Sequence, residues 1–385
     1  MLKHMKVLTT VAFVLIATAL NAQPSALAVA DSLYAVGNYS EAIQDLENIE
    51  EKSEAVYSRL AKSYVAKGDL SSALKNYRTV LDKNPNKVLT AMEYGEVLIK
   101  AGKLKSADSL YINLSTRYPK NASFQFQLGT IKERQNDSTA IEFWQKTIAL
   151  DKTHQQALYK LAKDALSKRN FPLAEELSLQ GLETNPSNAS LISILAQTYF
   201  NENSFILAIT PFEKLLELGQ GNEFVHSKLG YCYYRLHYHK EAIEQYNLAL
   251  GYEGRNSDTH YNLGKLYART GDLEKSETHL LMALLIKKQP VDAEFLSLAL
   301  TYKQQEDYKK ALQYFNSALE ENPDNERASY ERAVAADNYF KDEKAVLNYY
   351  QAYLGKYSKN GNSELIYLAE IRIKDINEEL HLNAE

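Results

Sequence analysis

The chain has 385 residues and a formal net charge of −5, with 24% charged and 45% hydrophobic side chains. This composition is too apolar for a chain that is disordered as a whole, and an acidic chain without a basic run lacks the face that nucleic-acid binding requires. Because Cys232 is the only cysteine, an internal disulfide is excluded. Only 8 prolines and 15 glycines occur, and frequent Ala, Leu, Glu and Lys favour helices.

The first 22 residues have the pattern of a secretory signal peptide. Lys3 and Lys6 precede a mostly apolar, uncharged run at 7–20, and the small residue Ala22 precedes the expected cleavage point. That run is shorter than the roughly 20 apolar residues of a membrane-spanning helix. We therefore predict cleavage after residue 22, no membrane span in the mature chain, and export to the periplasm, with secretion as the alternative.

A small residue recurs about every 34 residues along the rest of the chain. In most units another small residue stands twelve positions earlier. Two small residues on facing helices let the backbones approach closely, so each unit is predicted to be a tight helical hairpin. The recurring positions are Ala42, Ala73, Ala107, Ala140, Ala174, Ala208, Ala242, Ser276, Ala311 and Ala345.

Further signals give the limits of each unit. A bulky residue such as Tyr77 or Trp144 stands four positions after most of the small residues, on the same buried face. Gly68 fits the end of a first helix, and Pro85 fits the end of a second. The expected repeat region covers 23–359, with units that start near residues 23, 54, 88, 122, 155, 189, 223, 257, 292 and 326.

The C-terminal stretch at 363–382 alternates apolar and charged residues. It is predicted to be an amphipathic capping helix, because the last repeat of an array must shield its open apolar face.

These features resemble the tetratricopeptide repeat, whose pattern is W-x₂-L-G-x₂-Y followed by A, F and P. The resemblance implies an all-α, right-handed superhelical solenoid of about ten hairpins plus the capping helix. It also implies a concave groove, lined by the first helices, that binds partners. The clearest unit carries Tyr57, Leu60, Ala61, Tyr64, Gly68, Ala73, Tyr77 and Pro85.

The same resemblance places the fifth, ninth, twelfth and thirteenth residues of each first helix in the groove. In this chain these positions are rich in aromatic and basic residues, which favours an extended protein or peptide partner. An acidic partner is one alternative among these. The alternative is that the tyrosines only fill core positions of the repeat. The predicted groove residues are Phe126, Tyr159, Lys163, Phe200, Tyr231, Tyr234, Arg235, Tyr261, Lys265 and Arg269.

No motif for catalysis was found in the sequence. It lacks a phosphate-binding loop, a nucleophile elbow and an H-E-x-x-H pair. His226, Cys232, His237 and His239 form the densest group of metal-ligand types, but nothing in the repeat register makes them converge. We therefore predict neither enzymatic activity nor a metal or cofactor.

The predicted function is a non-catalytic scaffold or adaptor for proteins of the cell envelope. The alternative is a periplasmic assembly chaperone or targeting factor for outer-membrane or secreted clients. A scaffold would co-purify with its partners stoichiometrically, whereas a chaperone would bind many clients weakly. A homo-oligomer is a further alternative, which would form if the open end of the array stacks on a second copy of the chain.

Overall fold

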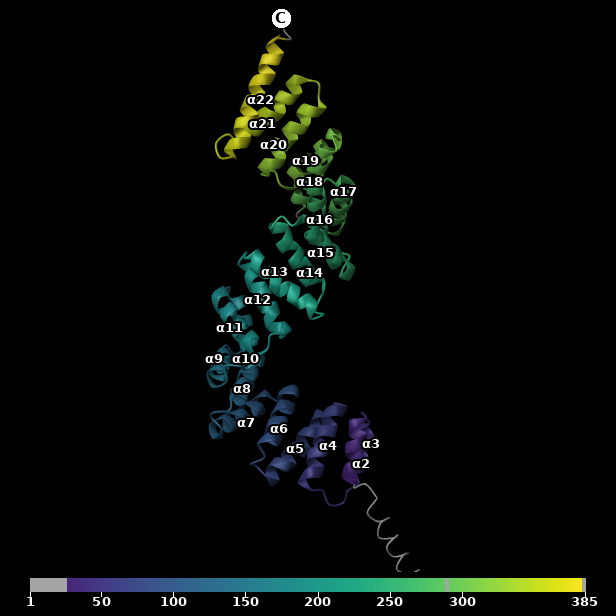
Figure 1. Cartoon of the computed structure of the whole chain (residues 1–385), viewed down its shortest axis with the longest axis vertical. Coiled ribbons are helices and arrows are strands. Elements are labelled where there is room, and N and C mark those ends of the chain that lie inside the picture. Colours follow the sequence, from purple (N-terminus) through teal and green to yellow (C-terminus); the bar gives the residue numbers. More distant parts are fainter. Residues whose placement is uncertain (1–25, 288–290, 383–385) are drawn as a thin grey trace, which may run out of the picture. The chain divides into compact units, whose positions relative to one another are not determined.

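Helix follows helix along the chain, and every hairpin is antiparallel (Figure 1). The computed structural model describes residues 26–287 and 291–382, and the predicted signal peptide lies outside these ranges. The described residues form 21 α-helices and no strand. The predicted all-α array of ten hairpins with an additional C-terminal helix is confirmed.

Each hairpin consists of a first helix, a short turn and a second helix. The pairs are α2 (Ala26–Ala35) with α3 (Tyr39–Glu47), α4 (Glu54–Lys67) with α5 (Leu70–Lys83), α6 (Val88–Lys100) with α7 (Leu104–Arg117), α8 (Ala122–Arg134) with α9 (Ala140–Leu150), α10 (Gln155–Ser167) with α11 (Phe171–Thr184), α12 (Ala189–Asn201) with α13 (Phe205–Glu217), α14 (Glu223–Arg235) with α15 (His239–Tyr252), α16 (Ser257–Thr270) with α17 (Leu273–Ile286), α18 (Asp292–Gln304) with α19 (Tyr308–Glu321), and α20 (Glu326–Tyr339) with α21 (Glu343–Tyr357).

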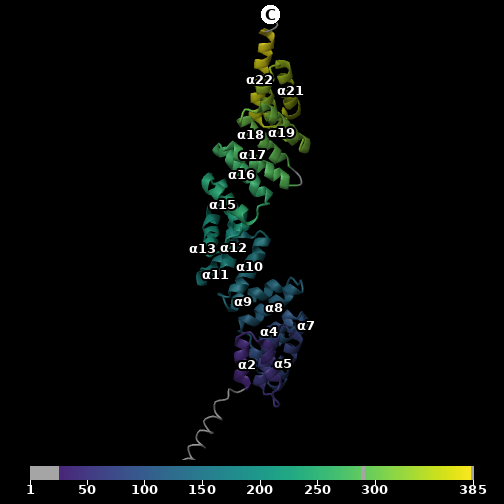
Figure 2. The same ribbon diagram turned by 90° about the vertical axis from the view of Figure 1, so that its right-hand side faces the viewer.

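The chain divides into two compact units, residues 1–161 and 162–385, and the division falls inside α10. Within each unit, successive hairpins lie side by side, as Figures 1 and 2 show. Each unit has its own buried clusters, so the core runs along the stacked hairpins instead of filling a central volume.

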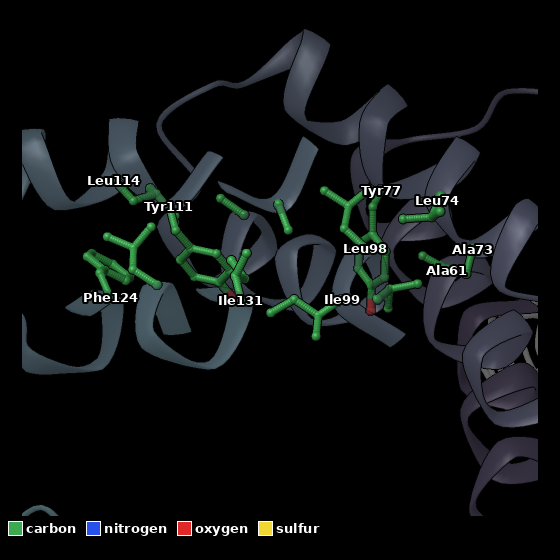
Figure 3. Close-up of a cluster of buried hydrophobic side chains, with 14 residues drawn as sticks. Ala61, Ala73, Leu74, Tyr77, Leu98, Ile99, Tyr111, Leu114, Phe124 and Ile131 are labelled. Carbon is green, nitrogen blue, oxygen red and sulfur yellow. The ribbon is translucent and has the colours of Figure 1, made fainter. Parts of the chain in front are cut away.

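The repeating small residues of the first helices are explained by the bulky residues of the second helices. A Cβ atom added at Gly95 would lie 2.7 Å from the ring of Tyr111, which is fully buried in the cluster shown in Figure 3. A Cβ atom at Gly264 would lie 2.6 Å from Leu280. A glycine therefore lets the partner side chain contact the backbone of the first helix, in addition to the predicted contact between small residues.

Hydrogen bonds from tyrosine hydroxyls join successive hairpins. In each case the tyrosine lies on a first helix and the carboxylate on the second helix of the preceding hairpin. In the first unit the hydroxyl of Tyr64 donates to Glu47. In the second unit the donor–acceptor distance is 2.6 Å for each of three pairs: Tyr199 with Glu175, Tyr233 with Glu213, and Tyr302 with Glu277.

The last helix, α22 (Ser363–Leu382), packs against α21. Its Ala369 and Ile376 are fully buried beside Tyr353 of α21. Arg372 adds a two-pronged ion pair, with its Nε and Nη2 atoms 2.7 and 2.9 Å from the carboxylate of Asp337. The helix thus covers the apolar face of the tenth hairpin.

Candidate functional site

The predicted groove residues are divided between the two units. Phe126 and Tyr159 belong to the first unit, and both are half-buried. The ring of Phe126 lies 4.8 Å from that of His154. Lys163 belongs to the second unit and is exposed. Among the described residues of the second unit, no hydrogen bond or ring contact joins Lys163 to the other seven predicted residues.

The other seven predicted residues form a connected group in the second unit. Its centre is a set of aromatic rings from α12, α13 and α14. The ring centroid of Tyr231 lies 5.4 Å from that of Phe200, 5.7 Å from that of Phe205 and 6.2 Å from that of Tyr234. Tyr231 and Tyr234 are one turn apart on α14, so both rings emerge on one face of that helix.

Two cations of α16 lie against these rings. The Nζ atom of Lys265 is 4.9 Å from the ring centroid of Tyr261 and 5.2 Å from that of Tyr234. The guanidinium carbon of Arg269 is 5.4 Å from the Tyr234 centroid. Since Tyr234 lies on α14, these contacts connect the first helices of two neighbouring hairpins.

Two cations of α14, Lys228 and Arg235, also lie against aromatic rings. The Nζ atom of Lys228 is 4.5 Å from the ring centroid of Phe200, and the guanidinium carbon of Arg235 is 4.6 Å from that of Phe205. Arg235 also donates a 3.1 Å hydrogen bond from Nη1 to the hydroxyl of Tyr231. Cations within about 6 Å of an aromatic centroid are attracted by the ring, so the rings hold these side chains in place. We call the four side chains the cationic strip: Lys228, Arg235, Lys265 and Arg269.

The cationic strip takes no part in the ion pairs of the described residues. Among the described residues, none of its four side chains forms an ion pair with a carboxylate. The first unit differs, because there Lys62 pairs with Glu93 at 3.0 Å and Lys160 with Glu133 at 2.6 Å. The positive charge of the strip is therefore available to a partner.

Two hollows open beside the cationic strip. The first, the α14–α16 hollow, has a volume of about 520 Å³ and is lined by Phe200, Lys228, Tyr231, Tyr246 and Tyr261, among others. The second, the α16–α18 hollow, has a volume of about 370 Å³. Its lining includes Tyr261, Lys265, Arg269, Ser297, Gln304 and Arg327. Tyr261 borders both hollows, so they are neighbours along the same face.

A buried tyrosine, Tyr246, belongs to the lining of the α14–α16 hollow. Tyr246 is only 1% exposed, and its hydroxyl has no hydrogen-bond partner among the described residues. Burial raises the pKa of Tyr246, so the hydroxyl stays protonated and remains a donor. A buried donor without a partner costs about 1–3 kcal/mol, which an acceptor on a bound segment would offset.

Sequence reasoning missed several members of this site. Lys228 is the sixth residue of α14, and only the fifth, ninth, twelfth and thirteenth positions of a first helix were expected in the groove. Phe205 is the first residue of α13, which is a second helix and was not expected to line the groove. The one available signal for Lys228 was its position three residues before Tyr231, which places both on one helix face. Tyr246 stands four positions after Ala242, at the position expected for a bulky core residue, and it is buried there, but it also contributes to the lining of the hollow.

Three residues of the possible metal cluster, His226, Cys232 and His237, have other partners or roles, whereas Nε2 of His239 is buried without a hydrogen-bond partner among the described residues. The Nδ1 atom of His226 lies 2.8 Å from Oε1 of Gln245, and burial raises the pKa of the Cys232 thiol to about 12. His237 forms the turn after α14 with a φ of 64°. No group of three or more His, Cys, Asp or Glu side chains in the described ranges is arranged to hold a metal ion.

No helix in the described part of the chain combines the length and the apolar character that a bilayer crossing requires.

Three stretches of the sequence match models of the tetratricopeptide repeat: residues 58–122, 257–290 and 293–325. The chain therefore contains tetratricopeptide repeats, in agreement with its stacked hairpins.

Among curated proteins, the chain is 24% identical over 277 residues to the TPR repeat-containing protein YpiA of Bacillus subtilis (strain 168), covering 67% of this chain and 62% of that protein. It is 26% identical over 311 residues to the protein CTR9 homolog of Arabidopsis thaliana, covering 72% of this chain and 27% of that protein. The chain thus spans less than two thirds of the length of these relatives.

Two solved structures are also similar. The crystal structure of YrrB, described as a TPR protein with an unusual peptide-binding site, aligns with a TM-score of 0.47 at 22% identity, covering 50% of this chain and 98% of that chain. The crystal structure of MamA protein aligns with a TM-score of 0.42 at 22% identity, covering 44% of this chain and 92% of that chain.

Proposed function

We propose that this protein is a non-catalytic scaffold or adaptor that holds a segment of a partner protein in the second unit, along the first helices from α12 to α20. The observation that carries the proposal is the cationic strip, whose charged groups lie against aromatic rings and form no ion pair among the described residues. Tetratricopeptide repeats are typically non-catalytic interaction modules, which supports the same conclusion.

The chemistry of the strip suits a protein partner. Tyrosine and arginine dominate binding hot spots because they bury a large area and also form hydrogen bonds. The rings of Tyr231, Tyr234 and Tyr261 are half-buried, so each keeps a surface that a partner can cover. A partner that covers the strip also shields its cation–ring contacts from water, which strengthens them.

The proposal includes a location in the cell envelope, and this part rests on the signal-like sequence at 1–22 alone. In that compartment the protein would organise a stable set of envelope proteins. The alternative remains a chaperone or targeting factor, which would hold clients only for a short time.

The decisive experiment is quantitative co-purification from the native envelope fraction. It compares the wild type with a groove variant that carries Tyr234→Ala, Arg235→Ala, Lys265→Ala and Arg269→Ala. A matched control removes one tyrosine and three lysines from exposed positions of second helices: Tyr252→Ala, Lys240→Ala, Lys309→Ala and Lys344→Ala. Circular dichroism verifies that both variants keep the helical content of the wild type.

We expect a small stoichiometric set of proteins to be retained by the wild type and the control and lost from the groove variant. Retention of the same partners by the groove variant would refute the groove as the binding face. Weak capture of many unrelated clients would favour the chaperone. Absence of the protein from the envelope fraction would refute the location without affecting the groove.

A further inference from the structure

The α16–α18 hollow is lined by basic residues without acidic ones. Lys265, Arg269 and Arg327 contribute to it, and none of its lining residues is Asp or Glu. Arg327 has one carboxylate near it, that of Glu331, at a distance of 3.9 Å. Three cations around one hollow favour an anionic group, since arginine and lysine bind carboxylates through charge-assisted hydrogen bonds.

The floor of this hollow is apolar. Leu280 is fully buried beneath it, and Leu296 and Leu300 also line it. Its volume of about 370 Å³ leaves room for a side chain whose methylene groups contact the floor while its head group meets the cations. An aspartate or glutamate side chain has this combination of a short apolar stem and a charged end.

The α14–α16 hollow differs from the α16–α18 hollow in the charge of its lining. Here Glu223 and Asp258 oppose the charge of Lys228. Oε1 of Glu223 accepts hydrogen bonds from Ser227 and Asn256, each at 2.7 Å, so this carboxylate is fixed in place. A second acidic side chain would be repelled here.

The walls of the α14–α16 hollow are aromatic, with Phe200, Phe224, Tyr231 and Tyr261 among them. Aromatic rings pack well against another ring in offset or edge-to-face contact. The hydroxyl of Tyr246 supplies a donor for a backbone carbonyl of the bound segment. This hollow therefore favours an apolar or aromatic side chain.

The spacing of the two hollows sets the spacing of the two side chains. One hollow lies between α14 and α16 and the other between α16 and α18, so they are separated by one step between first helices. Packed helices are about 8–10 Å apart, and an extended chain advances about 3.3 Å per residue. The step therefore corresponds to about three residues of an extended chain.

We propose that the groove recognises an extended segment of another protein with an acidic and an aromatic residue three positions apart. The acidic side chain occupies the α16–α18 hollow, and the aromatic side chain occupies the α14–α16 hollow. This inference rests on the proposed function and adds the chemical class of the partner segment.

The test uses the full chain and fluorescein-labelled peptides of a Gly-Ser background. Each peptide carries one Glu and one Phe at a sequence separation between one and six, in both orders. Reference peptides carry Glu alone, Phe alone, or Lys in place of Glu. Fluorescence anisotropy gives the dissociation constant for the wild type, for a Lys265→Ala and Arg269→Ala variant, and for a control with Lys240→Ala and Lys309→Ala.

We expect the affinity to peak at a separation of three in one of the two orders and to fall about tenfold when Lys replaces Glu. The Lys265→Ala and Arg269→Ala variant should lose this preference for Glu and keep the preference for Phe, while the control behaves as the wild type does. Equal affinity at all separations, equal affinity for Glu and Lys, or no binding up to about 1 mM peptide would each overturn the inference.

The two proposals fail in distinguishable ways. If the groove variant loses its envelope partners while the peptides show no preference for acid or spacing, the proposed function stands and the recognition rule is wrong. If the groove variant also keeps all of its partners, the proposed function itself is wrong.

Discussion

The hydroxyl of Tyr199 donates a 2.6 Å hydrogen bond to Oε1 of Glu175, which lies on the preceding helix, α11. The pKa of Tyr199 is raised to about 12, chiefly because the side chain is buried and in second place because its hydroxyl is bonded to this carboxylate. The bond thus holds between two successive hairpins at neutral pH and weakens only as the pH rises above the ordinary tyrosine value of about 10. In a repeat array such contacts between neighbours supply a large part of the stability.

The first prediction concerns this bond. Tyr199→Phe removes the donor but keeps the ring, so we expect the free energy of unfolding to fall by about 1–2 kcal/mol. Tyr252→Phe is the control, since its ring is 59% exposed. Urea unfolding followed by circular dichroism gives the total effect, and hydrogen exchange should localise it to α11 and α12. An effect no larger than that of the control would contradict the role of the bond.

The second prediction compares two glycines in helices. A Cβ atom at Gly264 would lie 2.6 Å from Leu280, whereas no atom lies within 4 Å of a Cβ at Gly251. Gly264→Ala should therefore lower the free energy of unfolding by about 1–3 kcal/mol through overpacking. Gly251→Ala should raise it by about 0.5–1 kcal/mol, because alanine loses less backbone entropy in a helix. Thermal unfolding of both variants checks the opposite signs.

The sequence was sufficient to predict the all-α architecture because each hairpin repeats the same local signals. Small residues, bulky residues and turn glycines all recur with one period, as Gly68 and Tyr77 illustrate. The reason for the small residues was only partly predictable, since the contact of Gly264 with Leu280 depends on how closely the two helices pack. The division of the chain inside α10 has no signal in composition.

The candidate site was less predictable than the fold. Helical periodicity alone assigns Tyr231 and Tyr234 to one face, but it cannot show that Lys265 of the next hairpin reaches the ring of Tyr234. Such contacts depend on the placement of residues about thirty positions apart. The unpaired hydroxyl of Tyr246 is likewise a property of packing, and no local pattern indicates it.

The third prediction concerns a pair of histidines, of which His260 is buried and His279 is half-buried. His279 Nδ1 lies 2.9 Å from His260 Nδ1, and His260 Nε2 lies 3.2 Å from the carbonyl oxygen of Gly254. With Nε2 of His260 donating to that carbonyl, its Nδ1 accepts a hydrogen bond from Nδ1 of His279. Burial is the largest cause that lowers the pKa of His279, and together with the neighbouring His260 and Lys275 it lowers that pKa to about 4. The ring of Tyr267 stacks on that of His279.

A lowered pKa means that the unfolded chain binds a proton more readily than the folded one. His279 therefore contributes its full stability above about pH 6.5, and the contribution falls as the pH drops from about 6.5 to 4. We expect a loss of about 1–2 kcal/mol after allowance for solvent screening, because the side chain of His279 is only half-buried. Urea unfolding at pH 7.5 and 4.5 should show a smaller difference for His279→Gln than for the wild type or for His381→Gln. Equal differences in all three would exclude His279 as the titrating group.

The fourth prediction concerns the only cysteine. Cys232 is fully buried, and burial raises the pKa of its thiol to about 12. Because the thiolate is the reactive form, iodoacetamide at pH 8 should modify Cys232 only when the structure opens, and the rate should rise with urea. In a Cys232→Ala background, Ser190→Cys places a thiol at an exposed position as a reference. Modification of native Cys232 at the reference rate would contradict its burial.

The last prediction separates stability from binding at a single atom. Tyr246 lines the α14–α16 hollow, and its buried hydroxyl has no hydrogen-bond partner among the described residues. Tyr246→Phe should therefore leave the free energy of unfolding unchanged or raise it by about 1 kcal/mol. The same change removes the donor proposed for the backbone of the bound segment and should weaken binding of the best Glu–Phe peptide about threefold to tenfold. Tyr77→Phe is the control, because Tyr77 is a buried core ring in the other unit. Unfolding and anisotropy measurements on the same preparations would show the opposite signs, and unchanged peptide affinity would mean that this hydroxyl does not contact the segment.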